Sequence, residues 1–539
     1  MNAKRMSRQK WILGMLVGLL VFAILATTLD DFGINWDEPL YMKAATRYLA
    51  WLGILRQDLL RGNLGHALSD SVITEWWVQP FELHPPVGKL VAGISWALTR
   101  RFAHPIAMFR LGYAAIFALM TMVLFWMVAE IRDTRSATFS VSALLLMPHV
   151  FAYANMVALD SLLTSLWVMA VYVFWKVRDK AHWGWTFVLG LLFGLAFGTK
   201  FTAILMPATL FLWVLLYRRS RGLFFRLVAM GLIGFATFFL IWPWLYAAPL
   251  ERLAMYLGAV FGIGQQMGVE FSHATKTQYY LGQVYHGSPW HYPFVLTFAT
   301  VPATLMLTCL VGGIVFVRAA RRDEAAGLVL LNIAVPIAVT ATGLSAAYNG
   351  VRQFLPVFPY LAALAGTGFG VLADWVEARL SGRGFWLVVL VTVVVALALL
   401  IPPARSLVNI HPYELAYYSE WVGGVPGAYR LGLETTFWCD TYIDALPYLN
   451  AHAAPGELIW AESPAPLRMY QQLGMLRCDV TIRGGDLVDP YTCDFAVIQA
   501  RQSGYTTRIR EILATRQAVH SLWYNGVLLM AIYHWEKAL

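Results

Sequence analysis

Charged side chains are scarce in this sequence of 539 residues. Only 13% of the residues are charged and 59% are hydrophobic, whereas a soluble globular protein carries about 25% charged residues. Apolar runs of about 18 residues or more recur over the first three quarters of the chain, and each is long enough to cross a membrane as a helix. The composition therefore excludes an ordinary soluble protein and predicts a polytopic membrane protein.

Nucleotide-binding motifs are missing as well. The sequence contains neither a G-x-x-x-x-G-K-[ST] phosphate loop nor a G-x-G-x-x-G turn after a strand, the glycine-rich patterns that hold nucleotide phosphates. The formal net charge of +9 does not indicate a nucleic-acid partner, because the Lys and Arg residues lie in short loops between apolar runs. That pattern is typical of the cytoplasmic loops of a membrane protein.

Cysteine is rare, with four residues in the whole chain. Cys309 lies inside an apolar run, and we expect it to serve packing alone. Cys439, Cys478 and Cys493 fall in the polar C-terminal part, where three cysteines allow one disulfide and leave one thiol over. No C-x-x-C pair or His cluster in the sequence indicates a structural metal.

Eleven apolar runs are predicted to span the membrane. The first follows a basic N-terminus and lacks a small-residue cleavage site, so we interpret it as a retained span and not as a signal peptide. Two of the runs are short, and short spans near polar residues often border a cavity. The predicted spans are 11–29, 111–129, 137–159, 161–175, 184–199, 201–217, 227–250, 292–317, 325–347, 353–373 and 385–403.

The charges of the loops predict the orientation of these spans. The segment His84–Phe102 has an apolar part of only about 13 residues, too short to cross comfortably, and we place it at the outer surface as an interfacial helix. Six loops rich in Lys and Arg then share the cytoplasmic side with the N-terminus. They are 1–10, 130–136, 176–183, 218–226, 318–324 and 374–384. The protein is therefore predicted to lie in the plasma membrane with an extracytoplasmic C-terminal region.

The chain is predicted to divide into two parts. Residues 1–403 form a transmembrane module with interfacial helices in the outer loop 30–110, and residues 404–539 form a soluble α/β domain. In the second part, "GELIWAES" and "DFAVIQA" predict short buried strands, and "GYTTRIREILATR" predicts a helix. The pair Asn525-Gly526 between two β-rich runs predicts a hairpin. The fold class is thus an α-helical polytopic membrane protein with a C-terminal α/β domain.

Five charged residues fall at the outer ends of the predicted spans. Asp37 and Glu38 follow the first span, and Asp160 lies between two apolar runs with almost no loop. Lys200 and Arg352 are lone cations in other short outer loops. Because a charge near hydrocarbon is unfavourable by a few kcal/mol, it usually faces a cavity or a partner. We therefore expect the five side chains to meet in one pocket.

Each of these residues also has a simpler interpretation when it is taken alone. An acidic pair can merely mark the end of a span, and Asp160 can cap a helix. Lys200 and Arg352 can anchor the interface by extending toward lipid headgroups. The convergence of three carboxylates and two cations on one face of the membrane favours a functional site over these separate explanations.

Other candidates lie in the outer segments. His84 begins the interfacial helix and could bind a substrate group, and Lys89, one turn further, could bind a phosphate. Tyr285, His291 and Tyr348 could contact the faces of a sugar. Aromatic belts at membrane interfaces also explain tyrosine and tryptophan without a function.

Taken in order, these motifs resemble those of the polytopic GT-C glycosyltransferases. The sequence is similar to the protein O-mannosyltransferase-like family, glycosyltransferase family 39, and to its bacterial relatives, which include the lipid A aminoarabinose transferases. A segment after the last span, "HPYELAYYSEWVGG", is similar to one in bacterial members. The other matching segments are "WDEPLYMKAA", "HPPVGKL", "ANMVALDSLL", "GLAFGTKFTA", "GQVYHGSPWHYP" and "YNGVRQFLPVFPYLA".

The resemblance implies a sugar donor on a polyprenyl phosphate that is used at the outer side of the membrane. It implies Asp37, with Glu38 adjacent, as the catalytic base and Asp160 as the second acidic position. It also implies that Lys200 in "GTKF" contacts the lipid phosphate. The chain departs from its relatives near the second acidic position. Relatives often have a nearby Arg or Tyr there, whereas this chain has Asn155 and Met156. The resemblance therefore does not fix the residues that contact the sugar.

We therefore expect a glycosyltransferase that moves a hexosyl or pentosyl group from a polyprenyl phosphate to a hydroxyl of a protein, lipid or glycan, with inversion. Arg352 and Lys89 would join Lys200 at the donor phosphate. The sequence requires no cofactor, although Asp37 and Asp160 could hold Mg²⁺ or Mn²⁺.

Two other functions use the same features. The main alternative is a secondary transporter or lipid flippase, in which the charges would serve gating. Such carriers commonly show two related halves, and the sequence has no internal repeat. The second is a membrane-anchored binding protein, which leaves the charged positions of the spans without a purpose.

Overall fold

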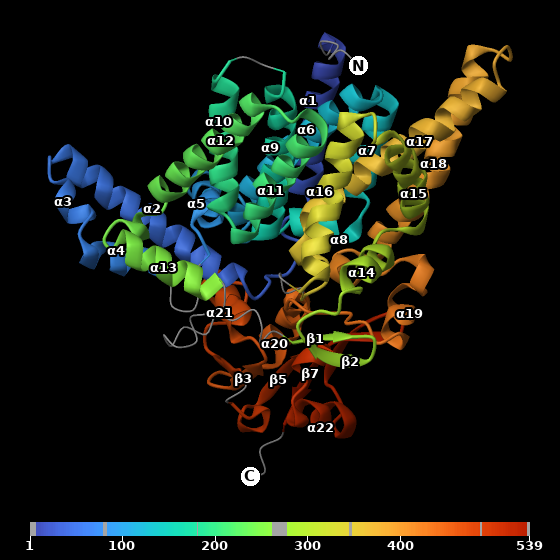
Figure 1. Cartoon of the computed structure of the whole chain (residues 1–539). Helices are drawn as coiled ribbons and strands as arrows, with labels where there is room; N and C mark the ends of the chain where they lie inside the picture. Colours follow the sequence, from blue (N-terminus) through green and yellow to red (C-terminus); the bar gives the residue numbers. More distant parts are fainter. Residues whose placement is uncertain are drawn as a thin grey trace.

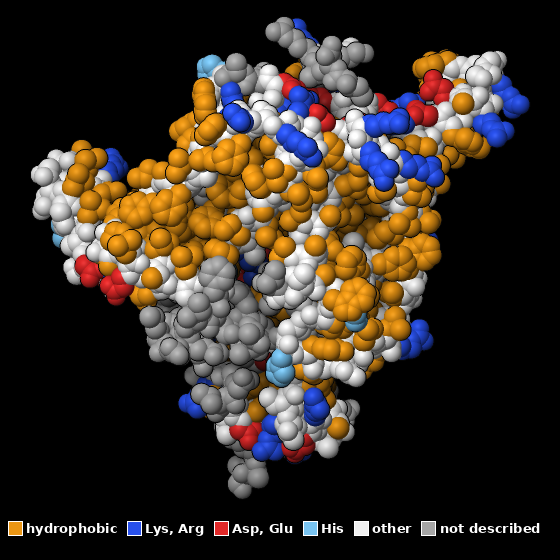
Figure 2. Space-filling view, viewed as in Figure 1, with side chains coloured by type: hydrophobic (Ala, Val, Ile, Leu, Met, Phe, Trp, Pro, Cys, Tyr) orange, Lys and Arg blue, Asp and Glu red, His pale blue; other side chains and the backbone are white. Residues whose placement is uncertain are grey.

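The structure is a computed structural model that describes residues 7–78, 84–179, 182–260, 277–343, 348–485 and 488–535. A thick layer of helices lies above a smaller C-terminal domain, which carries a five-stranded sheet (Figure 1). Apolar side chains cover most of the visible outside of the helical layer (Figure 2). Lys and Arg side chains gather at the end of the layer that lies away from the C-terminal domain (Figure 2).

Eight helical segments among the described residues are long and apolar enough to cross a membrane. Each coincides with one of the eleven predicted spans, so the multi-pass membrane prediction is confirmed. The segments are α1 (Arg8–Ala26), α6 (Ala107–Ile131), α9 (Leu159–Val177), Phe201–Arg218 with η1 (Phe201–Ile204), α11 (Leu205–Trp213) and η2 (Val214–Arg218), α12 (Arg221–Leu240), α16 (Glu324–Ala341), Arg352–Arg379 with η6 (Arg352–Val357) and α17 (Phe358–Arg379), and α18 (Phe385–Ile410).

The predicted span 137–159 is wrong as a single helix. The chain forms α7 (Thr134–Leu145) and α8 (Pro148–Ala154), which are bent by 77° relative to each other. Pro148 accounts for the break, because it has no N–H to continue the hydrogen bonding of α7 and is favoured in the first turn of a new helix.

Two other predicted spans are shorter than expected. The run 292–317 divides at Pro302 into α14 (Tyr292–Thr300) and α15 (Ala303–Ala319), and α10 (Gly184–Phe197) takes the place of the run 184–199. These helices fall below the length of a regular span. The end of the predicted span 325–347 lies outside the described residues.

The outer loop 30–110 is largely helical. The segment that we placed at the interface forms α5 (Val87–Thr99), which has 13 residues. It follows α2 (Glu38–Leu60), α3 (Leu64–Ala67) and α4 (Asp70–Trp77). With α13 (Pro249–Val260), α2 to α4 extend to one side of the helical layer (Figure 1).

An aromatic cluster holds this extension together. The rings of Tyr48 and Trp77 stack at 4.1 Å between centroids, and Trp51 packs edge-on against Trp77 at 5.1 Å. Trp242 and Tyr256 belong to the same buried cluster. Large aromatic side chains bury enough area to join short helices that lack a core of their own.

The predicted cytoplasmic loops meet at one end of the helical layer. Arg132, after α6, pairs with Asp374 of α17. Arg218, at the end of η2, pairs with Asp179 and Glu324. Loops from distant parts of the chain therefore share one face, as their charges predicted.

The C-terminal domain is an α/β unit around a sheet of order β4-β3-β5-β7-β6. The central strand β5 (Phe495–Gln499) is parallel to β3 (Leu458–Ala461) and antiparallel to β7 (Val527–His534). The remaining elements are β4 (Thr481–Gly484), β6 (His520–Tyr524), α19 (Gly424–Arg430), α20 (Ala445–His452), α21 (Pro464–Gln472) and α22 (Thr507–Thr515).

The predicted local structure of this domain is confirmed. Both predicted strands form, as β3 and β5, and the predicted helix forms as α22 with Ile509 and Ile512 buried. The hairpin between β6 and β7 turns at Asn525 and Gly526, whose φ angles are 47° and 80°. A two-residue turn of this kind needs positive φ at both positions, which Asn and Gly adopt readily.

All four cysteines are free. The disulfide that the three C-terminal cysteines allowed is therefore not formed. Cys439 and Cys493 are buried, whereas Cys478 is exposed. Cys309 is also buried and contacts the carbonyl of Leu361, in agreement with a packing function.

A histidine joins the first outer loop to the start of the C-terminal domain. His411 follows α18, and its Nε2 lies 3.0 Å from Asp31 while its Nδ1 lies 2.7 Å from the buried Glu414. The hydrogen bond with Glu414, supported by Asp31, raises the pKa of His411 from 6.5 to about 9. The protonated imidazole therefore bridges two segments that are far apart in the sequence.

This bridge makes the stability of the protein depend on pH. Because the pKa of His411 is higher in the folded state, its stabilising effect is complete below about pH 6.5 and is lost as the pH rises through about 9. We expect the melting temperature of the wild type to exceed that of the His411→Gln variant most at about pH 6, with a difference that shrinks toward about pH 9.5. Thermal unfolding in detergent measures this difference, and a constant difference over the range would contradict the assignment.

Candidate active site

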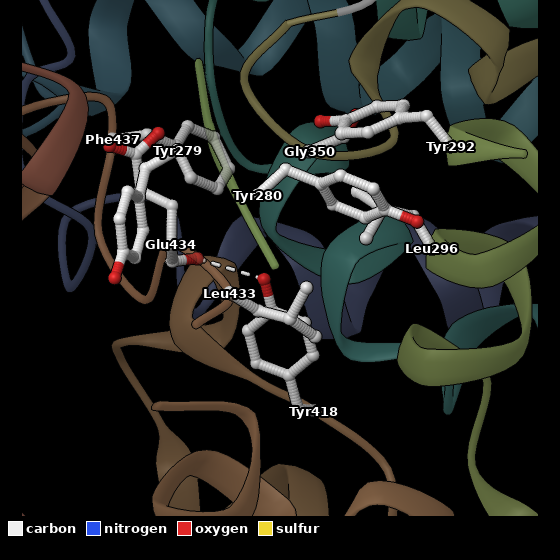
Figure 3. A pocket seen from close by; sticks show the side chains of 9 residues that line it. All are labelled: Tyr279, Tyr280, Tyr292, Leu296, Gly350, Tyr418, Leu433, Glu434 and Phe437. Atoms are coloured by element: carbon white, nitrogen blue, oxygen red, sulfur yellow. Dashed lines mark hydrogen bonds between the residues drawn. The ribbon is translucent and has the colours of Figure 1, made fainter. Parts of the chain in front are cut away.

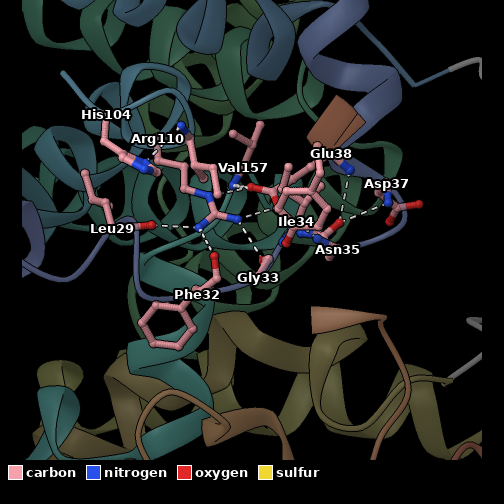
Figure 4. A network of polar contacts seen from close by, with 12 residues as sticks. Leu29, Phe32, Gly33, Ile34, Asn35, Asp37, Glu38, His104, Arg110 and Val157 are labelled. Atoms are coloured by element: carbon pink, nitrogen blue, oxygen red, sulfur yellow. Dashed lines mark hydrogen bonds and ion pairs between the residues drawn. The ribbon is translucent and has the colours of Figure 1, made fainter. Parts of the chain in front are cut away.

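A buried ion pair fixes the loop that leads into α2. Glu38, the first residue of α2, binds Arg110 of α6 through both oxygens, at 2.8 and 2.7 Å, and neither side chain is exposed. The same guanidinium donates to the carbonyls of Leu29, Phe32 and Gly33 at 2.7 to 2.9 Å (Figure 4). Arg110 therefore holds the end of α1 and the start of α2 in one position.

Further contacts saturate the carboxylate of Glu38. Its oxygens accept the backbone N–H groups of Asn35 at 3.0 Å and Val157 at 2.8 Å. The side chain of Asn35 in turn accepts the N–H groups of Asp37 and Glu38 (Figure 4). This geometry favours a positioning function for Glu38 over the catalytic function that the sequence predicted.

Asp37, Asp160, Lys200 and Arg352 form one ionic cluster. Arg352 donates Nε to Asp160 and Nη2 to Asp37, each at 2.6 Å. Lys200 Nζ lies 2.5 Å from the other oxygen of Asp160. Four positions that are far apart in the sequence therefore meet in space, as the predicted topology required.

Each member of the cluster comes from the beginning of a helical element. Asp37 is the N-cap of α2, and Asp160 lies in the first turn of α9, where Ala158 and not Asp160 is the N-cap. Lys200 immediately precedes η1, and Arg352 begins η6. Helix beginnings present free N–H groups and the positive end of the helix dipole. The cluster thus combines two cations with a backbone environment that favours negative charge.

Asp37 is the most accessible member of the cluster. Its side chain is 23% exposed, against 3% for Asp160, 4% for Arg352 and 6% for Lys200. A carboxylate that takes a proton from a substrate must reach that substrate. Asp37 satisfies this condition, whereas Asp160 has one cation on each oxygen and is placed to orient both.

Two neighbours of the cluster were not predicted. Gln353 Oε1 accepts a hydrogen bond from Lys200 at 2.9 Å, and its Nε2 has no hydrogen-bond partner within the described part of the chain. The indole of Trp438 lies 4.5 Å from the guanidinium carbon of Arg352. No local sequence pattern connects these residues, because the contacts depend on the tertiary fold.

Arg110 was also missed, although the sequence carried a signal for it. It stands as a lone cation at the start of an apolar run, directly before the predicted span 111–129. The same rule that selected Lys200 and Arg352 applies to it.

The structure gives individual contacts for Lys89, His84 and Tyr348. Lys89 is buried in α5 and donates to the carbonyl of His84 at 2.6 Å. Tyr348 is buried and lies close enough to Arg352 for an electrostatic interaction. The predicted contacts of these three residues with substrate stay predictions.

Tyr285 lies in the hairpin of β1 (Thr277–Tyr280) and β2 (Gln283–His286), and His291 follows that hairpin in the chain. The hydroxyl of Tyr280 lies 2.8 Å from Nδ1 of His291, and its ring lies 6.1 Å from that of Tyr285. Residues 261–276, which precede this hairpin, lie outside the described residues.

Tyr280 also borders a small pocket between the hairpin and the C-terminal domain (Figure 3). The pocket has space for about one water molecule. Its polar lining includes Glu434. Burial of this side chain raises its pKa to about 7. The other lining residues are Tyr279, Tyr292, Leu296, Gly350, Tyr418, Leu433 and Phe437.

The carboxylates of Asp37 and Asp160 are arranged around cationic side chains. A divalent ion between them would displace Arg352 and would lie beside Lys200. No group of three His, Cys, Asp or Glu residues suited to a metal occurs among the residues that the structure describes. The donor set as folded fits the two cations better than Mg²⁺ or Mn²⁺.

The buried pair of Glu38 and Arg110 makes a testable contribution to stability. Exchange of Arg110 for Leu leaves a carboxylate buried without a partner, which destabilises a protein by about 3–5 kcal/mol. We expect a large fall in the melting temperature of Arg110→Leu and partial recovery in the double variant with Glu38→Gln. As a control, Arg135→Leu removes a half-exposed pair with Asp374, and such pairs contribute about 1 kcal/mol or less. Equal effects of the two single variants would argue against the buried pair as an anchor.

Residues 83–246 match the sequence profile of the family described as dolichyl-phosphate-mannose-protein mannosyltransferase. A comparison with curated proteins gives no match. The matched segment includes Lys89, Arg110, Asp160 and Lys200.

The chain is also similar to solved structures. ArnT from Cupriavidus metallidurans in the apo state has 17% identity and a TM-score of 0.51 over 97% of this chain and 97% of that chain. The structure of ArnT from the same organism bound to undecaprenyl phosphate has 16% identity and a TM-score of 0.49 over 98% of each chain. An Archaeoglobus fulgidus oligosaccharyltransferase tethered with an acceptor peptide has 11% identity and a TM-score of 0.49, over 90% of this chain and 69% of that one.

The likeness to apo ArnT extends over nearly the full length of both chains, so it includes the C-terminal domain. At 17% identity it shows a shared fold and leaves function to be argued from the site. The predicted resemblance to the GT-C enzymes is confirmed. The chain is a polytopic membrane protein with the GT-C glycosyltransferase fold, and it is related over residues 83–246 to the protein mannosyltransferase family.

Proposed function

We propose that the protein transfers a sugar from a polyprenyl phosphate to a hydroxyl acceptor at the extracytoplasmic face of the plasma membrane. The observation that carries this proposal is the ionic cluster, in which the partly exposed Asp37 contacts the buried Arg352 and Asp160 links Arg352 to the buried Lys200. The matching family profile is named for a dolichyl-phosphate-mannose donor. Such a donor keeps its hydrocarbon tail in the bilayer and its phosphate at the interface, where these side chains are proposed to lie.

Lys200 and Arg352 stabilise the leaving phosphate. As the bond between the sugar and the phosphate breaks, its electron pair moves to the phosphate oxygen, which gains negative charge. Fixed cations stabilise such charge most strongly where water is excluded. Both cations bind carboxylates in this structure, so the phosphate takes over contacts that Asp37 and Asp160 make. The free Nε2 of Gln353 offers one more donor at this point.

Asp37 accepts the proton of the acceptor hydroxyl as its oxygen attacks the anomeric carbon. Arg352 contacts Asp37 at 2.6 Å, so the proposed base and one phosphate-binding cation lie within the dimensions of one sugar ring. In a single displacement the acceptor attacks from the face opposite the phosphate, and the anomeric configuration inverts. Asp160 orients both cations before the donor phosphate binds.

The other predicted residues are assigned around this centre. Tyr348 contacts the sugar from beside Arg352, Lys89 supports the phosphate, and His84 with Tyr285 and His291 contacts the acceptor side. The acceptor is a hydroxyl of a protein, lipid or glycan, and the transferred group is a hexose or a pentose. If a divalent ion binds, it does so at Asp37 and Asp160 in place of Arg352.

The orientation in the membrane follows from the charges. The face that joins Arg132 and Arg218 to their partners is rich in Arg, as cytoplasmic faces are. The N-terminus lies on that side. Residues 1–403 form the transmembrane module, and residues 404–539 form the extracytoplasmic domain.

A transfer assay separates this function from its main alternative. Purified protein in lipid nanodiscs is incubated with a panel of labelled polyprenyl-phosphate sugars and hydroxyl acceptors. The proposed enzyme releases free polyprenyl phosphate and labels an acceptor. A transporter or flippase would move the lipid between leaflets and leave the bond between sugar and phosphate intact.

The Asp37→Asn variant tests the base. We expect kcat to fall by about 10²- to 10⁴-fold, the usual contribution of a general base, with donor affinity retained because both cations remain. The control is Asp58→Asn on the same helix, where the carboxylate binds His66. Full turnover by Asp37→Asn would remove Asp37 from the mechanism.

The Lys200→Met variant tests the phosphate contact. Loss of one charge-assisted hydrogen bond of about 1.5–3 kcal/mol should raise the donor Kd by about 10- to 150-fold. The control is Lys176→Met, which removes a cation that binds Glu130 at the predicted cytoplasmic end. Binding of a fluorescent polyprenyl phosphate measures both, and an unchanged Kd for Lys200→Met would exclude its contact with the phosphate.

A further inference from the structure

One residue of the C-terminal domain contacts both Arg352 of the ionic cluster and the segment that leads to Asp37. The ring of Trp438 lies 4.5 Å from the guanidinium carbon of Arg352, and the tryptophan is fully buried. Its backbone carbonyl accepts the N–H of Trp36 at 3.1 Å. Trp36 directly precedes Asp37. Trp438 therefore contacts Arg352, the proposed phosphate-binding residue, through its ring. Through its backbone it contacts the residue next to the proposed base.

The C-terminal domain holds Trp438 firmly in place. The N–H of Cys439 donates to the buried Gln499 at the end of β5 at 3.1 Å, and Cys439 adopts a φ of 64°, which is uncommon for a residue with a side chain. The carbonyl of Asp440 lies against Gly33, where an added Cβ would come within 1.8 Å of it. Residues 438–440 therefore pack between the sheet of the C-terminal domain and the segment around Gly33.

Two more contacts join this domain to the same outer loop. The N–H of Ile34 donates to the hydroxyl of Tyr470 at 2.6 Å. The guanidinium of Arg501 lies 4.6 Å from the ring of Trp36. The segment that leads to Asp37 thus packs between the membrane helices and the C-terminal domain.

The contact of Trp438 with Arg352 differs in kind from those of the two carboxylates. Asp37 and Asp160 bind the N–H edge of the guanidinium, which is the edge that a phosphate must also use. Trp438 contacts Arg352 by a cation–π interaction with its ring face. A phosphate can therefore replace a carboxylate at the edge while the tryptophan keeps its contact.

The indole N–H does not explain the position of this ring. Nε1 of Trp438 is buried and has no hydrogen-bond partner in the ranges that the structure describes, although buried indoles usually have one. The ring of Trp438 instead contacts Arg352 with its face. It also packs against the ring of Tyr153, at 5.5 Å between centroids.

We propose that Trp438 is a positioning residue that holds the guanidinium of Arg352 while its carboxylate contacts exchange for the donor phosphate. The C-terminal domain is then an integral part of the catalytic centre and not a separable module for acceptor recognition. This inference rests on the proposed function insofar as Arg352 binds the donor phosphate.

Variants at position 438 test the inference by donor KM. Trp438→Leu removes the aromatic face and keeps an apolar side chain, and we expect donor KM to rise by about 10- to 30-fold, the ratio that a buried cation–π contact supports. Trp438→Phe keeps a ring face without the N–H and should restore donor KM to within about threefold of wild type. Equal losses in both variants would overturn the proposal.

The dependence on Arg352 is tested in a double-mutant cycle. In an Arg352→Ala background, Trp438→Leu should leave donor KM unchanged, because the group that it positions is gone. A rise of the same factor in both backgrounds would overturn the inference and leave the proposed transfer intact. A wild-type protein that transfers no sugar from any donor would instead overturn the proposed function itself.

Fluorinated tryptophans at position 438 keep the test decisive if Trp438→Leu lowers the melting temperature. Fluorine weakens the negative potential of the ring face with little change in shape, so donor KM should rise stepwise with each added fluorine. The matched control is Trp460 of β3, which is buried in the same domain and donates to the carbonyl of Val488. The inference would be overturned if fluorination at position 438 left donor KM unchanged. It would also be overturned if fluorination at position 460 raised donor KM by the same factor.

Discussion

The arrangement of the site depends on the interactions of the Arg352 guanidinium. Its edge binds Asp160 of α9 and Asp37 at the start of α2, and its face lies against Trp438 of the C-terminal domain. A buried charge is tolerated only when it is paired and hydrogen-bonded. Three parts of the chain must therefore be in place before this arginine can be buried, and their packing is coupled through one side chain.

Two adjacent carboxylates receive different functions from their surroundings. Glu38 is fully buried and accepts hydrogen bonds from Arg110 and from backbone N–H groups. Asp37 is partly exposed and has one cationic partner. Two carboxylates at neighbouring positions thus differ in environment, which fits the proposal that Glu38 is an anchor and Asp37 the reactive group. The anchor matters for the reaction because it fixes the backbone from which Asp37 projects.

The sequence predicted features that depend on local pattern or on loop charge. It located the positions of the apolar helices, the turn at Asn525-Gly526 and the common face of Asp37, Asp160, Lys200 and Arg352. It failed where a single residue outweighed a hydrophobic pattern, as Pro148 does between α7 and α8. It grouped Glu38 with Asp37 as a catalytic carboxylate and did not find Trp438, because the partners of both residues lie in distant segments that only the fold brings together.

The same contacts favour the proposed catalytic site over a transport pathway. Alternating access requires one group of helices to move against another around a bound substrate. Here Arg352, Asp160 and Asp37 connect η6, α9 and α2, and Arg110 connects α6 to α2. Separating such buried pairs is unfavourable by about 3–5 kcal/mol each, so large relative motions of these helices carry a high barrier. A site that holds its charges in fixed positions is instead suited to stabilising a transition state, because preorganised groups need no rearrangement as charge develops.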